Sequence, residues 1–401
     1  MTELYPLIEG GELIGVIGSG GDATIVCRRG GECRYYLWLS TREAVDVTSL
    51  LDKRHALVIG GEKGRGFAPI GSWVLAPPYI HARSVTSLDE YAEWLARLVG
   101  REIRGKRVLL GFSGGKDSLA ALLVLLRLQE YVGFRLHVMY IHIPFLEAPR
   151  NIEFVERVSR RLGVSIDFVE APRRDMKALL KWKGMPRRGY RYCTMYKAKP
   201  MRQVLKEDPR AIEVIGDRLT ESPKRFERLS KAAAARAVLS GRKFRPTYML
   251  SLLDIVSMVR GSGLIHPAYL EGAPRVACDL CPYRVLYELH QLPDLEDPEL
   301  IEKVLRKTWQ KWYNWTSYEE FREQHLWRFP AKLAKPILYA KKLVRSMELE
   351  RISREQVVEY MRRVWEDPLP RAPRISEPWV LAEAALRAWR RRELLAIPVE
   401  E

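Results

Sequence analysis

The segment Val108–Ser118 constrains this chain more than any other part of its sequence. An apolar run there predicts a buried strand, the letters Ser-Gly-Gly-Lys-Asp-Ser follow it, and an apolar helix pattern, Leu119–Leu128, comes next. A strand, a glycine turn and a helix N-terminus together suit phosphate, because glycines let backbone N–H groups converge and the helix dipole adds partial positive charge. Lys116 supplies a full charge, and Ser113 and Ser118 supply hydroxyl groups. The segment therefore predicts an anion-binding loop.

This loop is not a Walker A sequence, which needs four residues between its first glycine and Gly-Lys, whereas Gly111 and Gly115 leave only three. It resembles instead the pyrophosphate loop (PP-loop) of the N-type ATP pyrophosphatases, which hold ATP and adenylate an oxygen of a second substrate. The resemblance implies ATP and Mg²⁺ as cofactors, with Asp117 helping to hold the metal. A glycine turn between an ordinary strand and helix is the alternative. The residues expected to bind the nucleotide here are Ser113, Gly114, Gly115, Lys116, Asp117 and Ser118.

Length, charge and hydropathy limit the class of protein. The 401 residues suffice for two or three domains. Lys and Arg total 67 against 50 Asp and Glu, a net charge of +17, which favours nucleotides, RNA or DNA as partners. A thermophilic protein with a charged surface is the alternative. The sequence has no apolar stretch long enough to span a membrane and no secretory signal, so we expect a cytoplasmic protein with no membrane partner.

The chain divides into three regions by pattern. Residues 1–85 are expected to form a β-rich domain, since short apolar runs alternate with glycine turns. Residues 86–295 are expected to form the nucleotide-binding domain, because strands and helices alternate from about residue 105. This alternation predicts an α/β fold with a doubly wound, mostly parallel sheet, in which ligands bind beyond the carboxyl ends of the strands. Residues 296–401 are expected to form a basic helical region.

Individual elements follow from the same patterns. In the middle region the expected strands are 108–112, 136–141, 164–169 and 212–216, and the expected helices include 118–131, 150–162 and 224–238. In the last region the expected helices are 298–312, 330–347, 354–365 and 376–393. Tryptophans interleave with the charges of this region, which suits single-stranded nucleic acid. Tryptophan at helical spacing nevertheless favours core packing for most of them.

Five cysteines are too few for a disulfide scaffold in a chain of this size. Cys278 and Cys281 form a C-x-x-C unit whose thiolates can share one metal ion, and Cys193 is a third sulfur in the same region. A zinc site would need a fourth ligand. The candidate histidines are His142, His266 and His290.

Cys27 and Cys33 flank a predicted hairpin turn. Two ordinary thiols are the favoured interpretation. A cross-strand disulfide is the alternative, since cytosolic disulfides do occur in thermophiles. Zinc binding would need further ligands, and none is evident nearby.

The surroundings of Cys193 resemble a second family. The spacing from Cys193 through Lys197 to Pro200 is similar to the C-x3-K-x2-P motif of the phosphoadenosine phosphosulfate (PAPS) reductase family, which belongs to the same superfamily as the ATP pyrophosphatases. In its cluster-bearing adenylyl sulfate (APS) reductases, a Cys-Cys pair at this point and a later C-x-x-C hold a 4Fe–4S cluster. Cys193 aligns with the second cysteine of that pair, and Tyr192 stands in place of the first.

Residues 216–225 add a match to the G-x-R-x-x-E-S-x-x-R segment of that family. They follow a predicted strand, so guanidinium groups there are placed to bind phosphate. The resemblance covers about residues 105–290 and implies an adenine nucleotide alpha hydrolase-like fold that holds ATP, PAPS or APS. The further nucleotide ligands it implies are Lys197, Arg218, Glu221 and Arg225, and the metal ligands are Cys193, Cys278 and Cys281.

Sulfonucleotide reductases use a cysteine in a late Glu-Cys-Gly-Leu-His motif, and no cysteine follows Cys281 in this sequence. We therefore expect ATP-dependent adenylation and sulfur transfer, similar to tRNA thiolation, with a three-cysteine 4Fe–4S cluster or, alternatively, Zn²⁺. Lys116, Asp117 and Cys193 would be catalytic. The expected partners are tRNA or another nucleic acid and a sulfur or electron donor protein. A sulfite-forming PAPS or APS reductase is one functional alternative, and a non-catalytic nucleic-acid-binding protein is the other.

Overall fold

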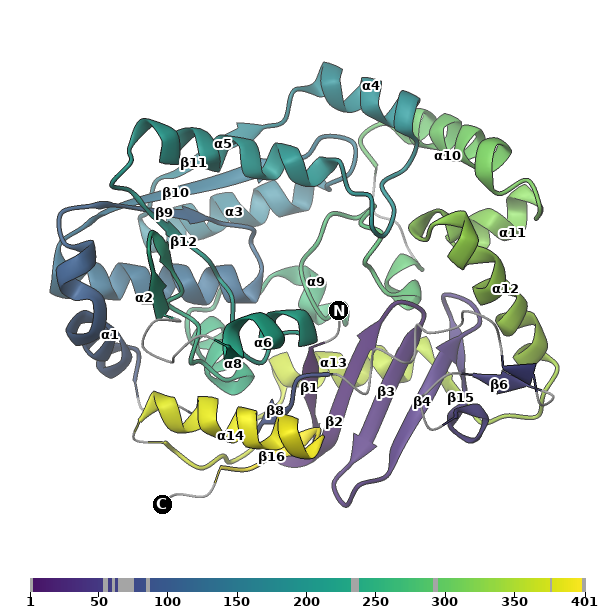
Figure 1. Ribbon diagram of the computed structural model, residues 1–401, viewed down its shortest axis with the longest axis horizontal. Helices are drawn as coiled ribbons and strands as arrows, with labels where there is room; N and C mark the ends of the chain where they lie inside the picture. The colour runs from purple at the N-terminus through teal and green to yellow at the C-terminus, as the bar shows by residue number, and fades with distance from the viewer. Residues whose placement is uncertain are drawn as a thin grey trace.

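Two sheets lie next to each other in the computed structural model, and helices surround them (Figure 1). One sheet is parallel and has helices packed against it, and the other is an antiparallel sheet formed by the N-terminal part of the chain. The structure describes residues 3–52, 57–59, 62–63, 76–83, 87–231, 238–290, 295–375 and 377–398.

The parallel sheet has the strand order β11-β10-β9-β12-β14-β13. All neighbouring pairs are parallel except the last, in which β13 runs antiparallel to β14. The order confirms the predicted α/β, doubly wound, mostly parallel sheet. From β9 the chain crosses to β10 on one side, and β12 lies on the other, so the loop after β9 sits at the switch point where such sheets bind ligands. The strands are β9 Arg107–Gly111, β10 Arg135–His142, β11 Ile166–Glu170, β12 Ile212–Val214, β13 Leu239–Ser240 and β14 Lys243–Phe244.

The helices of this region follow the predicted alternation. Helix α2 is almost entirely buried, because it packs between the sheet and the helices α1 and α8. It ends at Gly133, which takes the left-handed conformation that glycine adopts without strain. Of the predicted helix 224–238, α6 forms the part up to Ser230, and residues 232–237 lie outside the described ones. The helices are α1 Leu88–Ile103, α2 Lys116–Val132, α3 Pro149–Leu162, α4 Arg173–Lys183, α5 Cys193–Glu207, α6 Pro223–Ser230, α8 Leu252–Gly261 and α9 Pro267–Leu270.

The antiparallel sheet has the order β1-β2-β3-β4-β5-β15 and agrees with the expected β-rich N-terminus. Its last strand comes from far along the chain, because Ile352 of β15 pairs with Ala44 of β5. Likewise, β16 pairs with β8, so the C-terminal region completes sheets that the N-terminal region begins. The strands are β1 Leu4–Glu9, β2 Glu12–Gly20, β3 Ala23–Arg28, β4 Cys33–Trp38, β5 Glu43–Asp46, β6 Val58–Ile59, β7 Glu62–Lys63, β8 Tyr79–Ile80, β15 Arg351–Ser353 and β16 Leu395–Ala396.

Cys27 and Cys33 form a disulfide, so the interpretation of these residues as two ordinary thiols is wrong. The physical reason is the register of the hairpin. Cys27 of β3 is the direct partner of Cys33 in β4, and their Cα atoms lie 4.0 Å apart. The alternative of a cross-strand disulfide is the one that the structure has.

The C-terminal helices begin and end close to the predicted residues. Helix α11 was not expected, because its six residues are too few for a clear helical period. Core packing is confirmed for Trp327 and Trp365, which are buried, and the other tryptophans of this region are half-buried against the core. The helices are α10 Pro298–Trp312, α11 Tyr318–Glu323, α12 Ala331–Arg345, α13 Arg354–Glu366 and α14 Pro378–Arg391, with short 3-10 turns at η1 Thr48–Leu50, η3 Leu286–Leu289 and η4 Leu326–Arg328.

Gly272, which follows α9, packs against α13 at a point with no room for a side chain. Its φ is +82°, and an added Cβ would lie 2.8 Å from the Cα of Val358 in α13. We expect Gly272→Ala to lower the free energy of unfolding by at least about 2 kcal/mol, since strained φ and overpacking both contribute. Gly263→Ala is the control, because its φ is +70° with open space around it. Urea unfolding of both variants measures the difference, and equal losses would contradict the clash.

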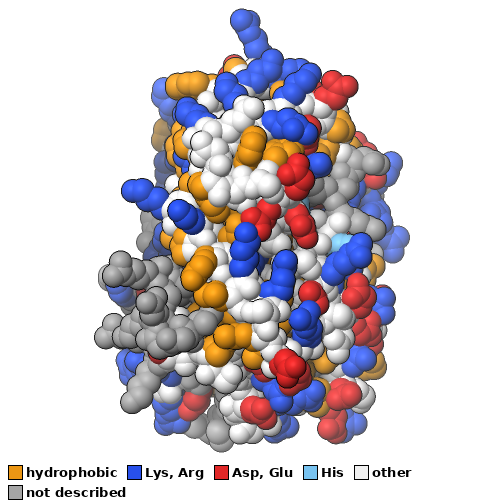
Figure 2. Space-filling model, turned by 90° about the vertical axis from the view of Figure 1, so that its right-hand side faces the viewer, with side chains coloured by type: hydrophobic (Ala, Val, Ile, Leu, Met, Phe, Trp, Pro, Cys, Tyr) orange, Lys and Arg blue, Asp and Glu red, His pale blue; other side chains and the backbone are white. Residues whose placement is uncertain are grey.

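None of the helices in the described part of the chain combines the length and the apolar character that a membrane crossing requires. Figure 2 shows the face formed by α10–α12, on which basic, acidic and hydrophobic side chains are mixed. Basic and hydrophobic side chains are prominent at the upper end of that face, where α4 and α10 lie in Figure 1.

Candidate nucleotide and thiol site

The predicted anion-binding loop, residues 112–116, connects β9 to the first turn of α2. Gly114 needs its φ of +75°, and a Cβ there would meet the ring of Phe154 at 3.4 Å. The hydroxyls of Ser113 and Ser118 lie 3.1 Å apart, and Ser118 donates to the carbonyl of Gly115 at 2.9 Å. These hydrogen bonds hold the loop in a tight curve at the helix N-terminus, which is the geometry that concentrates positive potential.

Lys116 is buried in this structure and lies under the start of the chain. Its side chain is 2% exposed, and its Nζ lies 2.7 Å from a carboxylate oxygen of Glu3 and 2.8 Å from Asp117. The ring of Tyr5 is 5.7 Å from the same Nζ. Burial alone would lower the pKa of Lys116, but Asp117 and the two tyrosine hydroxyls of Tyr5 and Tyr269 outweigh it and raise that pKa. Lys116 is therefore a charged group that is already neutralised by carboxylates.

Arg218 belongs to the same buried cluster. Its guanidinium is 0% exposed, donates to Asp117 at 2.6 Å and pairs with Glu3. Asp117 thus accepts from Lys116 on one carboxylate oxygen and from Arg218 on the other. The Glu3 carboxylate bridges the two cations that the sequence assigns to nucleotide phosphates, so it lies where an anion would bind.

Glu221 and Arg225 are paired with each other rather than with a free anion site. Arg225 also contacts Asp217 at 2.9 Å, and Arg228 pairs with the same carboxylate. Both predicted nucleotide ligands follow β12 as expected, on the side of β9 opposite to β10. In the present arrangement their charges are balanced within α6 and the turn before it.

The three predicted metal ligands lie in one region of the fold but do not form a metal-binding group. Cys193 begins α5, whereas Cys278 and Cys281 lie in the loop after α9, yet the three sulfurs influence one another electrostatically. Burial, with further contributions from neighbouring acidic groups, raises the pKa of Cys278, and burial and Cys281 raise that of Cys193. Arg275 donates to the Cys281 sulfur at 3.9 Å. Among the described residues, however, no three His, Cys, Asp or Glu side chains are gathered closely enough to hold a metal ion.

Lys197 lies at this thiol cluster. Its Nζ donates to Glu147 at 3.3 Å and also hydrogen-bonds the Cys278 sulfur. Burial disfavours its charge, but Cys278 and Glu147 raise the pKa of Lys197. A positive charge beside Cys278 opposes the effect of burial and stabilises the thiolate form of that cysteine.

A chain of buried polar side chains connects the thiol cluster to the anion-binding loop. Glu147 accepts from Asn151 at 3.1 Å, and the amide oxygen of Asn151 lies 3.1 Å from Nε2 of His266. The His266 ring is 3.8 Å from the Cβ position of Gly114. Tyr269, two residues after Pro267, accepts from the backbone N–H of Lys116 at 2.7 Å. These contacts therefore link the predicted loop to the region of the three cysteines.

The histidines do not complete a zinc site with these thiols. His266 is hydrogen-bonded through both ring nitrogens, and burial lowers its pKa to about 3. His290 lies against Thr41 at 3.2 Å. Nδ1 of His142 lies 4.0 Å from a carboxylate oxygen of Glu147 and has no hydrogen-bond partner among the described residues. Burial lowers the pKa of His142.

Several residues of this site were missed by sequence reasoning. Glu3 and Tyr5 precede the loop by about a hundred positions and carry no motif. Glu147 and Asn151 lie at the start of α3, where the sequence resembles that of any amphipathic helix. Tyr269 lies within the segment that resembles the PAPS reductase family, and that resemblance is the only signal in the sequence that pointed to this residue.

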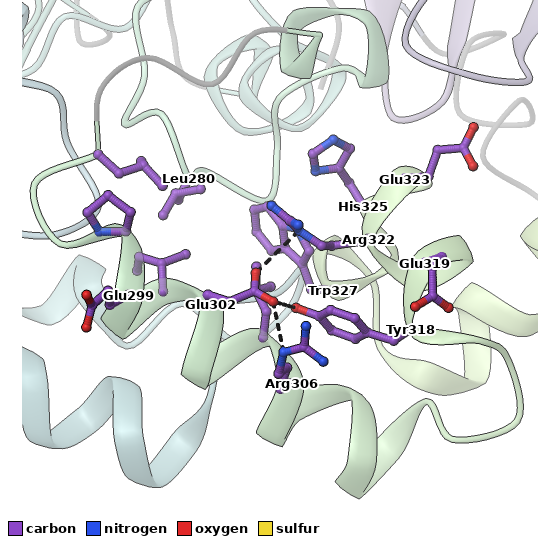
Figure 3. A pocket seen from close by; sticks show the side chains of 14 residues that line it. Leu280, Glu299, Glu302, Arg306, Tyr318, Glu319, Arg322, Glu323, His325 and Trp327 are labelled. Carbon is purple, nitrogen blue, oxygen red and sulfur yellow. Dashed lines mark hydrogen bonds and ion pairs between the residues drawn. The ribbon is translucent and has the colours of Figure 1, made fainter.

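A pocket of about 850 Å³ opens next to the C-x-x-C segment, between α10 and α11 (Figure 3). Leu280, which precedes Cys281, lines one side of it. Glu302 lies at its centre and accepts from Tyr318 at 2.7 Å, with Arg306 and Arg322 pairing with the same carboxylate. The anion-binding loop does not line this pocket, so the pocket is distinct from the predicted nucleotide site.

Comparison with known proteins relates the middle of the chain to one family. Residues 107–284 match the family model of the phosphoadenosine phosphosulfate reductase domain. No curated protein matches the chain in a sequence search. Solved structures that resemble it include the U34-tRNA thiolase NcsA from Methanococcus maripaludis with its 4Fe-4S cluster (15% identity, 65% of this chain and 80% of that chain, TM-score 0.35). Another is the NH3-dependent NAD synthetase from Campylobacter jejuni (14% identity, 66% of this chain and 99% of that chain, TM-score 0.30).

Proposed function

We propose that this protein is an ATP-dependent enzyme that adenylates a carbonyl oxygen of a tRNA base and replaces that oxygen with sulfur, since residues 107–284 match the family model of the phosphoadenosine phosphosulfate reductase domain. The family match supports an adenine nucleotide at the loop after β9. The choice of sulfur transfer rests on the three cysteines and on the basic character of the chain.

One observation carries the proposal. The loop after β9 and the region of the three cysteines are connected through the buried side chains of His266, Asn151 and Glu147 and the partly exposed Lys197. Adenylation needs phosphate binding, and sulfur transfer needs a nucleophilic sulfur near the activated carbon. The contacts between the loop and the cysteine region support placing both steps in one site.

Different residues would carry out different parts of the proposed reaction. The substrate oxygen attacks the α-phosphorus of ATP, and pyrophosphate leaves toward the loop, where the N–H groups of the helix start and Lys116 stabilise its charge. Asp117 would help to hold Mg²⁺ once its present partners give way to the nucleotide. Lys197 and Arg275 place positive charge beside Cys278 and Cys281, and Lys197 partly opposes the burial that raises the pKa of Cys278.

The proposed metal centre is a 4Fe–4S cluster held by Cys193, Cys278 and Cys281. The donor set fits in kind, because thiolates are the ligands of such clusters and the adjacent cations suit their negative charge. A cluster with three protein thiolates supplies one iron that is open to an exogenous sulfur ligand. The hydrogen bonds of both ring nitrogens of His266 argue against that histidine as the fourth ligand of zinc.

The direct test is ATP–pyrophosphate exchange with bulk tRNA under anaerobic conditions, together with iron, sulfide and zinc analysis of the anaerobically purified protein. We expect exchange that depends on tRNA, thiolated bases in the product and iron with sulfide in the protein. Absence of exchange and of thiolated base would refute the proposal.

A sulfite-forming PAPS or APS reductase is the second candidate, and the family match favours it. Such an enzyme would release sulfite from PAPS or APS with a thiol donor protein such as thioredoxin. Sulfite formation without tRNA-dependent exchange would select this candidate over the first.

Glu3 is expected to compete with the nucleotide. Its carboxylate pairs with Lys116 and Arg218, so a phosphate group must displace it in order to bind there. The apparent affinity for ATP is therefore reduced in proportion to the fraction of molecules in which the site is open. We therefore expect Glu3→Gln to bind ATP about tenfold more tightly. Isothermal titration measures the affinity. Glu9→Gln is the matched control, since Glu9 is exposed at the other end of β1, and an unchanged affinity in Glu3→Gln would contradict the competition.

A further inference from the structure

A row of aromatic rings and cations lies between α4 and α10. Nζ of Lys183 is 4.9 Å from the ring centre of Trp182 and 5.5 Å from that of Tyr190. The guanidinium of Arg187 is 5.1 Å from Tyr190 and 5.0 Å from Trp312, and Nζ of Lys311 is 4.8 Å from Trp312. We call these six residues the aromatic–basic surface: Trp182, Lys183, Arg187, Tyr190, Lys311 and Trp312.

The rings of this surface are accessible. Trp182 is 73% exposed and Tyr190 is 39% exposed, which is unusual for large aromatic side chains. Two elements hold the row together, because Lys307 of α10 donates to the carbonyl of Lys181 at the end of α4. Exposed rings fixed on packed helices offer flat faces at little entropic cost.

The cations of this surface lack acidic partners. Within the described residues, none of Lys183, Arg187 and Lys311 forms an ion pair with a carboxylate. Other cations of α4 and α10 do have carboxylate partners, as Arg173 has Glu170 and Arg306 has Glu302. The positive charge of the row is therefore available to an external anion.

The aromatic–basic surface leads directly to the thiol cluster. The ring of Tyr190 lies 6.2 Å from that of Tyr192, and Cys193 follows. Beside it, the guanidinium of Arg191 is 4.7 Å from the ring of Tyr283, and Tyr283 lies two residues after Cys281. A polymer that lies along the row would bring one of its units to the sulfurs.

We propose that the aromatic–basic surface binds a single-stranded segment of RNA, with bases stacked on Trp182 and Tyr190 and phosphates on Lys183, Arg187 and Lys311. Alternating rings and unpaired cations match the alternation of bases and phosphates in a single strand. An acidic polypeptide would use the cations but has no need for exposed ring faces. The inference rests on the proposed function, because it names the part of the protein that presents a tRNA base to the thiols.

The experiment measures binding of a fluorescein-labelled single-stranded oligoribonucleotide by anisotropy, without ATP. Trp182→Ala combined with Tyr190→Ala is expected to bind at least about tenfold more weakly, as stacking losses suggest. Lys183→Glu combined with Arg187→Glu is expected to reduce the salt dependence of binding, with a slope smaller by about 1.4 for two lost phosphate contacts. Trp182 fluorescence should be quenched on binding.

The matched control is Tyr339→Ala combined with Lys335→Glu, an exposed aromatic and an exposed cation on α12. These changes alter the total charge but leave the aromatic–basic surface intact, so RNA affinity should fall by less than about twofold. Equal losses in both sets of variants would overturn the proposal, as would binding of polyglutamate or duplex RNA more tightly than the single strand. Because no ATP is present, RNA binding without pyrophosphate exchange would refute the proposed function and leave this surface in place.

Discussion

Asp22→Ala is expected to lower the free energy of unfolding by about 3–5 kcal/mol. Asp22 lies in the turn between β2 and β3, and its carboxylate contacts Arg328 at 2.5 Å and Lys341 at 2.7 Å. All three side chains are 0–1% exposed. Without the carboxylate, two cations would remain buried with no counter-ion, and the link between the N-terminal sheet and the C-terminal helices would be lost. Urea unfolding followed by circular dichroism measures the effect.

The stabilisation of the folded state by Asp22 should also depend on pH, and it should decrease in acid. Burial alone would raise the pKa of Asp22, but Arg328 and Lys341 hold that pKa well below its usual range. The stabilisation is therefore complete above the unfolded-state pKa of about 4 and is lost as the pH falls through the folded-state pKa. The wild-type and Asp22→Ala proteins should accordingly converge in stability in strong acid.

Glu43→Ala is the control for this prediction. Glu43 pairs with Arg351 at 2.8 Å between β5 and β15, but both side chains are more than 40% exposed. Solvent screens such a pair, so its loss should cost less than about 1 kcal/mol. If the two variants were equally stable, the buried cluster would not be the link that we infer.

Lys116→Met is expected to reduce the rate of ATP–pyrophosphate exchange at least about hundredfold. Methionine keeps the shape of the buried side chain but cannot neutralise the charge that develops on pyrophosphate. Lys116→Arg keeps the charge and should retain more of the rate. Exchange kinetics under anaerobic conditions, with melting temperatures recorded for each variant, check this expectation.

The Lys116 prediction separates catalysis from folding. Removing Lys116 also leaves Glu3 with Arg218 alone, so some loss of stability is expected in Lys116→Met. If a protein that still melts cooperatively showed normal exchange, the loop would not be the site of chemistry. Normal exchange in Lys116→Met would therefore overturn the proposed function, whatever its stability.

Most of the fold could be predicted from the sequence, because local patterns determine it. The strand and helix at 108–132 and the helix at 298–312 have long apolar periods, and they form as β9, α2 and α10. The short α11 was not predicted, since a few residues carry too little periodicity. The partner strand β15 of the N-terminal sheet was not predictable either, because three residues pair across a sequence separation of about three hundred.

The candidate site could likewise be predicted only where local sequence determines it. Motif spacing identified the loop and the three cysteines, because glycine geometry and thiolate chemistry require particular residues at particular positions. The pairing of Cys27 with Cys33 depended on strand register, which the hairpin alone left open. The partners of Lys116 could not be predicted, since Glu3 is far from it in the sequence and meets it only in the folded chain.

The sequence by itself determined the chemical groups available to this protein: a glycine turn at a helix start, three cysteines in the middle region and an excess of positive charge. These follow from residue identity and short-range spacing, which any fold of the chain would have to respect. Only the tertiary structure decided which charges neutralise each other, that a buried polar chain joins the loop to the thiols, and that a row of rings and cations leads to them. Those are long-range contacts, and their energy depends on distance and burial, which exist only once the chain has folded.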